Sequence, residues 1–161
     1  MITAGQALMI ALAASVQQLG QQPAGNAFVE LRDAIYWVSL IPATSAAPGA
    51  PKSGEAVLVK VDHDTGDAAA PGVAADGRRP ERSPDVSSIS IAAAYDHAIA
   101  ALRGFDNYDK QARLSVVLRN DHYEVTFPPI VTAPVSRGID YAYQVWVDAA
   151  SGGIVKILVP S

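Results

Sequence analysis

The sequence repeats itself once, and this duplication constrains the fold more than any other feature. When the 161-residue chain is shifted by 87 residues, residues 7–42 align without a gap on residues 94–129, with 10 identities in 36 positions. Four of these identities are alanines. The other six lie at expected strand and turn positions: Val29, Leu31, Arg32, Tyr36, Val38 and Pro42 fall on Val116, Leu118, Arg119, Tyr123, Val125 and Pro129. The pattern therefore predicts two related units, residues 1–67 and 89–161, joined by a linker at 68–88 that is rich in Pro, Gly, Ala and Arg.

Each unit is expected to form one helix followed by antiparallel strands. Thr3 and Ser90 are suited to cap the two helices, which run to Gly20 and Gly104. A polar break around Asp33 splits the first long β segment into a hairpin, as Asn120 does in the second unit. The predicted β segments are 28–42, 56–62, 114–129, 141–148 and 154–159.

Composition and charge exclude several classes of function. Half of the residues are apolar and 17% are charged, which is typical of a chain that folds as one ordinary domain or two small ones. The net charge of −4 is shared equally by residues 1–80 and 81–161, so no basic half would neutralise nucleic acid. The absence of cysteine excludes disulfides, thiolate metal sites and cysteine nucleophiles.

The amino terminus holds a ten-residue apolar run at 7–16, which we interpret as part of a buried helix. No Lys or Arg precedes Arg32, so the basic region of a secretory signal is missing. The run is also shorter than the roughly 20 residues that span a bilayer. The chain as it stands is expected to be cytoplasmic without a membrane span, or periplasmic or secreted if a signal has been trimmed.

Alternation along the strands sorts the side chains between the two faces of the expected sheet. It places Tyr36, Val38, Val145 and similar residues under the helices, and both tryptophans, Trp37 and Trp146, on the face without helices. The residues expected to accompany them on this face are Ile35, Ile41, Leu58, Lys60, His122, Glu124, Thr126 and Gln144.

Two large aromatic side chains on an open face are expected either to be covered by another part of the chain or to bind a partner. The cover could come from sheet-on-sheet packing of the two units, or from a loop or the linker. The use would be a partner surface anchored by Trp37 and Trp146 and rimmed by Lys60, Glu124 and Gln144. The sequence leaves these arrangements open.

The motifs of both units resemble the PepSY domain family. Each unit carries Tyr-x-Val, at Tyr36 and Tyr123, followed by Val-x-Val-Asp ending at Asp62 and Asp148 and then by Thr-Gly or Ser-Gly. The resemblance covers about 120 residues of the chain. It implies a cystatin-like module with a helix on an antiparallel sheet, associated with binding or inhibiting peptidases. The family supplies no catalytic residues.

Other candidate sites are weaker. The acidic segment 62–67 loosely resembles a calcium loop, but its spacing is wrong and it is better explained as a hairpin turn. Glu124 and Asp148 are the best candidates for acid–base catalysis, but no other feature of the sequence supports such a role. No pair of histidines has the spacing of metal ligands. Arg78, Arg79 and Arg82 could dock an acidic partner or form a solvated linker.

The sequence thus predicts an α+β protein of two repeated helix-plus-antiparallel-sheet units related by a pseudo-twofold axis. Its predicted function is non-catalytic binding of another protein, as an inhibitor or antagonist of an enzyme or toxin, without metal or cofactor. The alternative is a small-ligand-binding protein or an enzyme that uses a pocket between helix and curved sheet. A homodimer is left open.

Overall fold

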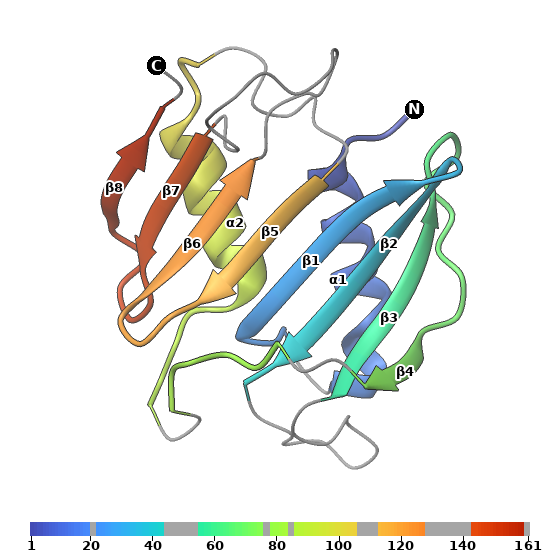
Figure 1. Ribbon diagram of the computed structural model, residues 1–161, viewed down its shortest axis with the longest axis horizontal. Coiled ribbons are helices and arrows are strands. Elements are labelled where there is room, and N and C mark those ends of the chain that lie inside the picture. Colours follow the sequence, from blue (N-terminus) through green and yellow to red (C-terminus); the bar gives the residue numbers. More distant parts are fainter. Residues whose placement is uncertain are drawn as a thin grey trace, which may run out of the picture.

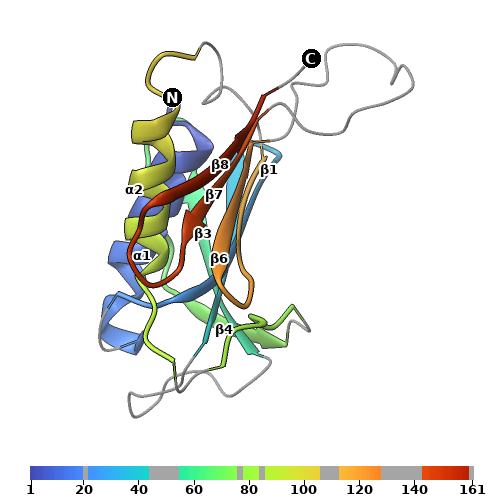
Figure 2. The ribbon, with the colours of Figure 1, turned by 90° about the vertical axis from the view of Figure 1, so that its left-hand side faces the viewer.

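Two helices cover one face of an antiparallel sheet in the computed structural model, which gives the chain an α+β fold (Figures 1 and 2). The structure describes residues 1–19, 22–43, 55–75, 78–83, 86–105, 113–127 and 143–159. The helices are α1 (Ala4–Leu19) and α2 (Ile91–Ala101), and neither of these described helices has the length and apolar character needed to cross a membrane. The other face of the sheet, which we call the helix-free face, looks toward the viewer in Figure 1.

The strands form one continuous sheet. Within the described ranges they are β1 (Gly25–Arg32), β2 (Ile35–Pro42), β3 (Glu55–Asp62), β4 (Gly72–Ala75), β5 (Arg113–Leu118), β6 (His122–Phe127), β7 (Tyr143–Asp148) and β8 (Ile154–Leu158). Their order is β4-β3-β2-β1-β5-β6-β7-β8, and every neighbouring pair is antiparallel. The central pair is β1 and β5, with Val29 opposite Leu114. The two halves are therefore joined edge to edge, and the alternative of sheet-on-sheet packing is wrong.

The first hairpin turns as its sequence predicts. Asp33 and Ala34 both have positive φ angles, of 51° and 63°, between β1 and β2. Consecutive residues in this left-handed region form the tight turn whose twist matches that of two antiparallel strands. The register that follows pairs Arg32 with Ile35 and Gly25 with Pro42, so the hairpin is eight residue pairs long.

Side-chain caps begin both helices. At α1, the Thr3 hydroxyl accepts from the Gln6 backbone N–H at 3.1 Å, and the Thr3 N–H donates to the Gln6 side chain at 2.8 Å. At α2, Ser90 accepts from the Ala93 N–H at 3.1 Å. These contacts satisfy backbone donors that lack a partner inside the helix, and they confirm both predicted caps.

The core lies between the helices and the sheet. The strands contribute alternate residues, so that Val57, Val59 and Val61 of β3 are fully buried while Leu58 and Lys60 face the other way. The helices contribute small side chains, among them Ala7, Ala11, Ala94 and Ala98. Alanine on the inner side of a helix lets it lie close to the sheet, as the sequence predicts.

Two tyrosines occupy the same place in the two halves. The Tyr36 hydroxyl donates to the backbone carbonyl of Ile2 at 3.0 Å, and the Tyr123 hydroxyl donates to that of Ile89 at 2.7 Å. Each bond links the second strand of a half to the residue two positions before its helix, and both donors and acceptors are 87 residues apart. The Tyr123 oxygen also accepts from the Gly25 N–H at 3.2 Å.

The turns after β3 and β7 share their geometry. Asp62 accepts from the backbone N–H groups of the second and third residues after it, at 2.8 and 2.9 Å, and Asp148 does the same at 3.0 and 2.7 Å. Gly66 and Gly152 follow with φ angles of 79° and 80°, a conformation that favours glycine. The N–H bonds hold the pKa of both carboxyl groups below its usual value. Asp62 therefore begins a hairpin turn, as predicted for segment 62–67.

Two features differ from the expectation. Residues 68–88 were predicted as a linker, but they contribute β4, which pairs with β3. Ile41 was expected on the open face, yet it is only 1% exposed. The residue opposite Ile41 on β1 is Asn26, whose side chain donates a hydrogen bond to the backbone carbonyl of Arg78 at 2.7 Å. The segment between the halves thus covers this end of the helix-free face.

Candidate functional site

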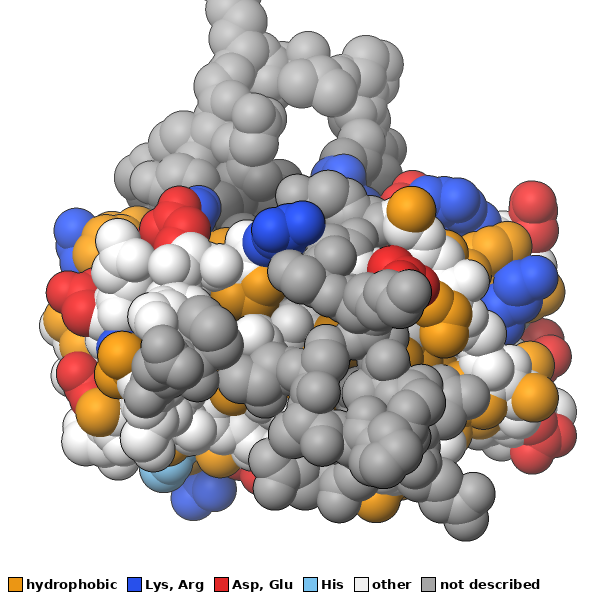
Figure 3. All heavy atoms as spheres, turned by 90° about the horizontal axis from the view of Figure 1, so that it is seen from below, with side chains coloured by type: hydrophobic (Ala, Val, Ile, Leu, Met, Phe, Trp, Pro, Cys, Tyr) orange, Lys and Arg blue, Asp and Glu red, His pale blue; other side chains and the backbone are white. Residues whose placement is uncertain are grey.

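Both tryptophans lie half-buried on the helix-free face, but far from each other. Trp37 is on β2 and Trp146 on β7, four strand spacings away in the sheet order. At about 4.8 Å for each spacing, their backbones are about 19 Å apart across the sheet. The register also offsets them along the strands, because Trp37 lies in the row of Arg113 and Trp146 in the row of Val117. From the lower end of the molecule, the described surface shows apolar and charged side chains interspersed (Figure 3). The helix-free face therefore holds two aromatic sites, and the single apolar patch expected from the sequence is not what the structure shows.

The first site is a groove of about 450 Å³, partly open to solvent, which we call the aromatic groove. The residues that matter for its chemistry are Phe28, Glu30, Trp37, Leu58, Arg78 and Arg113. They come from β1, β2, β3, β5 and the segment after β4. Apolar rings at the centre and charges around them give the groove both a floor for a side chain and polar contacts at its rim.

Cations lie over both rings of the aromatic groove. The Lys60 ammonium is 4.3 Å from the centre of the Trp37 ring, and the Arg32 guanidinium is 5.6 Å from it. The Arg78 guanidinium lies 3.7 Å from the centre of the Phe28 ring. Cation–π attraction of this kind contributes about 0.5–1 kcal/mol at exposed positions and fixes the charged group in place. The ring faces are thus capped by positive charges.

One carboxylate belongs to the described lining of this groove. Glu30 accepts a hydrogen bond from Arg32 at 2.9 Å. This bond, together with the charges of Arg32, Arg113 and Arg78, lowers the pKa of Glu30 below its usual value against the opposing effect of burial. Three arginines therefore lie close enough to act on one carboxylate, which makes the groove electropositive.

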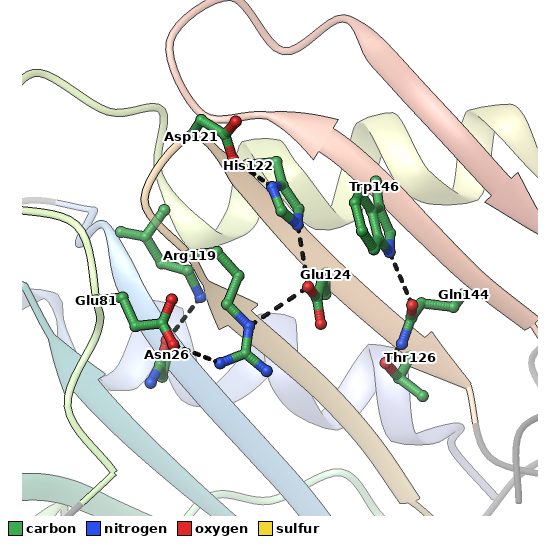
Figure 4. Close-up of polar contacts among 10 residues, drawn as sticks. Asn26, Glu81, Arg119, Asp121, His122, Glu124, Thr126, Gln144 and Trp146 are labelled. Carbon is green, nitrogen blue, oxygen red and sulfur yellow. Dashed lines mark hydrogen bonds and ion pairs between the residues drawn. The ribbon is translucent and has the colours of Figure 1, made fainter.

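The second site is a chain of charged side chains from β6, the turn between β5 and β6 and the segment between the halves, which we call the polar ladder (Figure 4). Glu81 pairs with Arg119 at 2.8 Å, and the Arg119 Nε lies 3.4 Å from Glu124. Glu124 contacts His122 Nε2 at 3.0 Å, while His122 Nδ1 contacts Asp121. Each member is thus held by its neighbours, and the Glu124 side chain is only 18% exposed.

Trp146 forms the outer part of this second site. Its ring stacks on His122, with centres 4.1 Å apart and planes 13° from parallel, and the Lys156 ammonium lies 4.9 Å from the ring centre. Its Nε1 donates to Gln144 at 2.7 Å, and Gln144 donates to Thr126 at 3.0 Å (Figure 4). The indole is therefore held by a hydrogen bond at its Nε1 and by contacts of its ring with His122 and Lys156.

The five residues predicted as a partner surface separate into two groups. Trp37 and Lys60 are neighbours in the aromatic groove, and Glu124, Gln144 and Trp146 are neighbours at the polar ladder. Sequence reasoning missed Phe28 and Arg113, and it named Arg78 only together with Arg79 and Arg82. Alternation from the buried Val29 and Leu114 would have placed Phe28 and Arg113 on the helix-free face. No local pattern brings Arg78 to it.

The acid–base candidates are committed to other contacts. Asp148 accepts from the N–H groups of its own turn, and Glu124 is paired with His122 and Arg119. Among the described residues there is no group of three His, Asp or Glu side chains placed to hold a metal ion. These carboxylates therefore serve the turn and the ladder.

Two of the three arginines between the halves, Arg78 and Arg82, have separate roles. Arg82 donates to the backbone carbonyls of Asn120 and Ser87, at 2.6 and 2.8 Å. These two hydrogen bonds hold the connecting segment against the turn between β5 and β6. Arg78 lies in the aromatic groove, so the three arginines do not form one cluster for an acidic partner.

Comparisons with known proteins give little beyond the general architecture. No protein family matches the chain, and no curated protein matches it. One solved structure, described as a "putative lipoprotein" from Clostridium difficile 630, aligns over 92% of this chain and 89% of its own, with 11% identity and a TM-score of 0.40. A likeness at this level carries no argument about function.

Proposed function

We propose that this chain is a non-catalytic protein-binding module that acts as an inhibitor or antagonist of an enzyme or toxin. The observation that carries the proposal is the aromatic groove on the helix-free face, where Phe28 and Trp37 lie between charged side chains. Aromatic and arginine side chains in a depression are the usual anchors of protein interfaces. Trp37 and Lys60 are proposed as contacts in the groove, and Glu124, Gln144 and Trp146 as contacts at the polar ladder.

The contacts of the charged side chains in the polar ladder favour a role in binding over a role in catalysis. A general base needs a free lone pair within reach of a substrate. In the polar ladder, the ring nitrogens of His122 both face carboxylates, and one face of the ring is covered by Trp146. The ladder is therefore better suited to hold a surface in shape than to move a proton.

We also infer that the two halves descend from one PepSY-like unit, with the units at 1–67 and 89–161. Each half has a helix followed by a strand hairpin and a third strand, and the sheet order runs outward from β1 and β5 in the same sequence. The tyrosine bonds to the helix starts and the Asp-to-Gly turns recur 87 or 86 residues apart. These are the residues of the Tyr-x-Val and Val-x-Val-Asp motifs, which supports the proposed family likeness.

A second candidate function is the binding of a small ligand. The groove volume of about 450 Å³ lies within the range of about 300–1,000 Å³ usual for ligand pockets. The groove lies on the helix-free face, whereas the layer between helices and sheet is filled by buried side chains. A small ligand would thus bind on the open face.

Affinity capture tests the proposed function. The immobilised chain is exposed to a lysate of its source cells, and the retained material is analysed for proteins and small molecules by mass spectrometry. We expect a specific protein that is retained by the parent chain and lost with Trp37→Ala or with Trp146→Ala.

The control is Asp96→Ala, an exposed substitution on α2 in the opposite layer, which should retain the same protein. Circular dichroism of each variant separates loss of binding from loss of folding. Retention that no substitution on the helix-free face changes would contradict the proposal. A retained small molecule without a protein would favour the second candidate.

A further inference from the structure

The aromatic groove holds a local excess of positive charge in an acidic protein. Arg32, Lys60, Arg78 and Arg113 line it or cap its rings, which is four of the 12 Lys and Arg residues of the chain. Glu30 is the one carboxylate among the described residues of the lining. The groove therefore carries about three positive charges, whereas the whole chain has a net charge of −4.

The cations have a defined spacing across the sheet. The register aligns Lys60 of β3, Trp37 of β2, Glu30 of β1 and Arg113 of β5 in one row. Three strand spacings separate the backbones of Lys60 and Arg113, which corresponds to about 14 Å. Lys60 and Arg113 are thus the cations at the two ends of the row. Between their backbones lie the Trp37 ring, over which the Lys60 ammonium extends, and the Glu30 carboxylate, which is paired with Arg32.

An extended peptide matches this spacing. Side chains four residues apart on one side of an extended chain are about 13–14 Å apart, and the residue midway points to the same side. Two carboxylates at this separation would reach the two ends of the row, while an apolar side chain between them would lie on the floor near Trp37 and Leu58.

We propose that the aromatic groove binds an acidic extended segment of a partner protein, with two carboxylates four residues apart and an apolar residue midway. The inference rests on the proposed function, because it specifies the chemistry of the partner at one of the two sites. Arg113 is exposed and has no hydrogen bond or salt bridge within the described part of the chain, so it is available to a carboxylate.

Other anionic partners fit the groove less well. Nucleic acid carries one negative charge per phosphate along its whole length, and the chain, with a net charge of −4, offers no extended basic surface to neutralise it. A small acid would reach only one end of the row at a time, because the ends are about 14 Å apart. A peptide chain can reach both.

The test measures peptide binding to the intact chain by fluorescence anisotropy. The probe is a fluorescein-labelled peptide with the core Glu-Ser-Leu-Ser-Glu, and the comparison peptide has Lys in place of both Glu residues. We expect the acidic peptide to bind and the basic one not to bind, with an affinity that falls as salt is raised from about 50 to 500 mM because exposed charges are screened.

Charge-reversal variants locate the binding. Arg113→Glu and Lys60→Glu should each weaken the binding of the acidic peptide about fivefold or more, since exposed ion pairs contribute up to about 1 kcal/mol. The matched control is Arg103→Glu, which makes the same charge change at an exposed position beyond α2 and should leave the affinity unchanged. Circular dichroism verifies that all variants fold.

Three results would overturn the inference: equal binding of the basic peptide, equal effects of Arg113→Glu and Arg103→Glu, or displacement of the peptide by an equal concentration of the free diacid glutarate. These failures are distinct from failure of the proposed function. A captured protein that depends on Trp37, found while the acidic peptide does not bind, would reject the acidic segment and leave the protein-binding module standing.

Discussion

The hydroxyl groups of two buried tyrosines connect the strands to the starts of the helices. Tyr123 is fully buried, and its oxygen both donates to Ile89 and accepts from Gly25. Tyr36 makes the equivalent bond to Ile2, and within the described residues its hydroxyl has no second hydrogen bond. Because an unsatisfied buried polar group costs more than a hydrogen bond contributes, Tyr123 should matter more for stability than its counterpart.

Replacement by phenylalanine tests this difference. Tyr123→Phe leaves the Ile89 carbonyl and the Gly25 N–H without their partner, and should lower the free energy of unfolding by about 1–3 kcal/mol. Tyr36→Phe should cost about 1 kcal/mol, because it removes one bond. Urea denaturation followed by circular dichroism measures both. A larger loss for Tyr36→Phe would show that the bonds to Tyr123 are not important.

Alkaline pH provides a second test of Tyr123. Burial raises its pKa from 10.0 to about 12. Between these values the unfolded chain loses the phenolic proton while the folded chain keeps it, so the free energy of unfolding falls as the pH rises from about 10 to about 12. Tyr123→Phe should reduce this fall, measured by urea denaturation at several pH values. An unchanged pH dependence would contradict the assignment.

Single residues also show how far sequence reasoning reaches. The alternation of β2 and β6 correctly assigned Tyr36, Val38, Tyr123 and Val125 to the core, because successive side chains of a strand point to opposite faces of the sheet. Alternation could not reveal that Ile41 is buried, because it says nothing of distant segments that lie on a face, such as the one at Arg78 that bonds to the neighbouring Asn26. The groove escaped prediction for the same reason.

The helices depend on their first turns. Neither helix has an acidic residue in its first turn or a basic residue in its last turn, so interactions of charged side chains with the helix dipole contribute little. The side-chain caps at Thr3 and Ser90 are then the main local signals that begin these helices.

Removing one cap should destabilise the protein measurably. Ser90→Ala leaves the Ala93 N–H without its acceptor and should lower the free energy of unfolding by about 1 kcal/mol. Ser87→Ala, at an exposed serine just outside the helix, is the matched control and should change it by less than about 0.5 kcal/mol. Thermal denaturation compares the two. Equal effects would mean that the Ser90 cap does not stabilise α2.

Strand β4 shows why short elements escape prediction. Its four residues, Gly72–Ala75, are all exposed and lie in a segment rich in Pro, Gly and Ala. The sequence therefore has no apolar alternation to mark a strand. Pairing with β3 decides its conformation, and such long-range pairing is invisible to a local pattern. Strands β2, β3, β5, β6 and β7 were predicted because each buries one face, whereas β8 was predicted from its apolar residues although most of them are exposed.

The sheet joins the two halves of the molecule through β1 and β5. This junction has four residue pairs, from Ala27 opposite Val116 to Glu30 opposite Arg113. The side chain of Asn26 adds a hydrogen bond to the Leu118 N–H at 2.7 Å, and Gly25 contributes the bond to Tyr123. Because these contacts cross the boundary between the halves, the halves should unfold together.

The two tryptophans can report this coupling, since Trp37 belongs to the first half and Trp146 to the second. Trp146→Phe leaves only Trp37, and Trp37→Phe leaves only Trp146. In each variant, the fluorescence transition in urea should coincide with that of circular dichroism, as expected for a single cooperative unit. Fluorescence and circular dichroism midpoints that differ within one variant would indicate two independently folding domains.

The helix-free face is the surface on which the proposed function depends, and a titration of the captured partner tests it most directly. Isothermal titration calorimetry should show that Trp37→Ala raises the dissociation constant about 30-fold or more, the effect of losing a central anchor worth about 2 kcal/mol. Lys60→Glu should weaken binding less, and Asp96→Ala on α2 should leave it unchanged. A dissociation constant that stays the same in Trp37→Ala and Lys60→Glu would contradict the assignment of this face to protein binding.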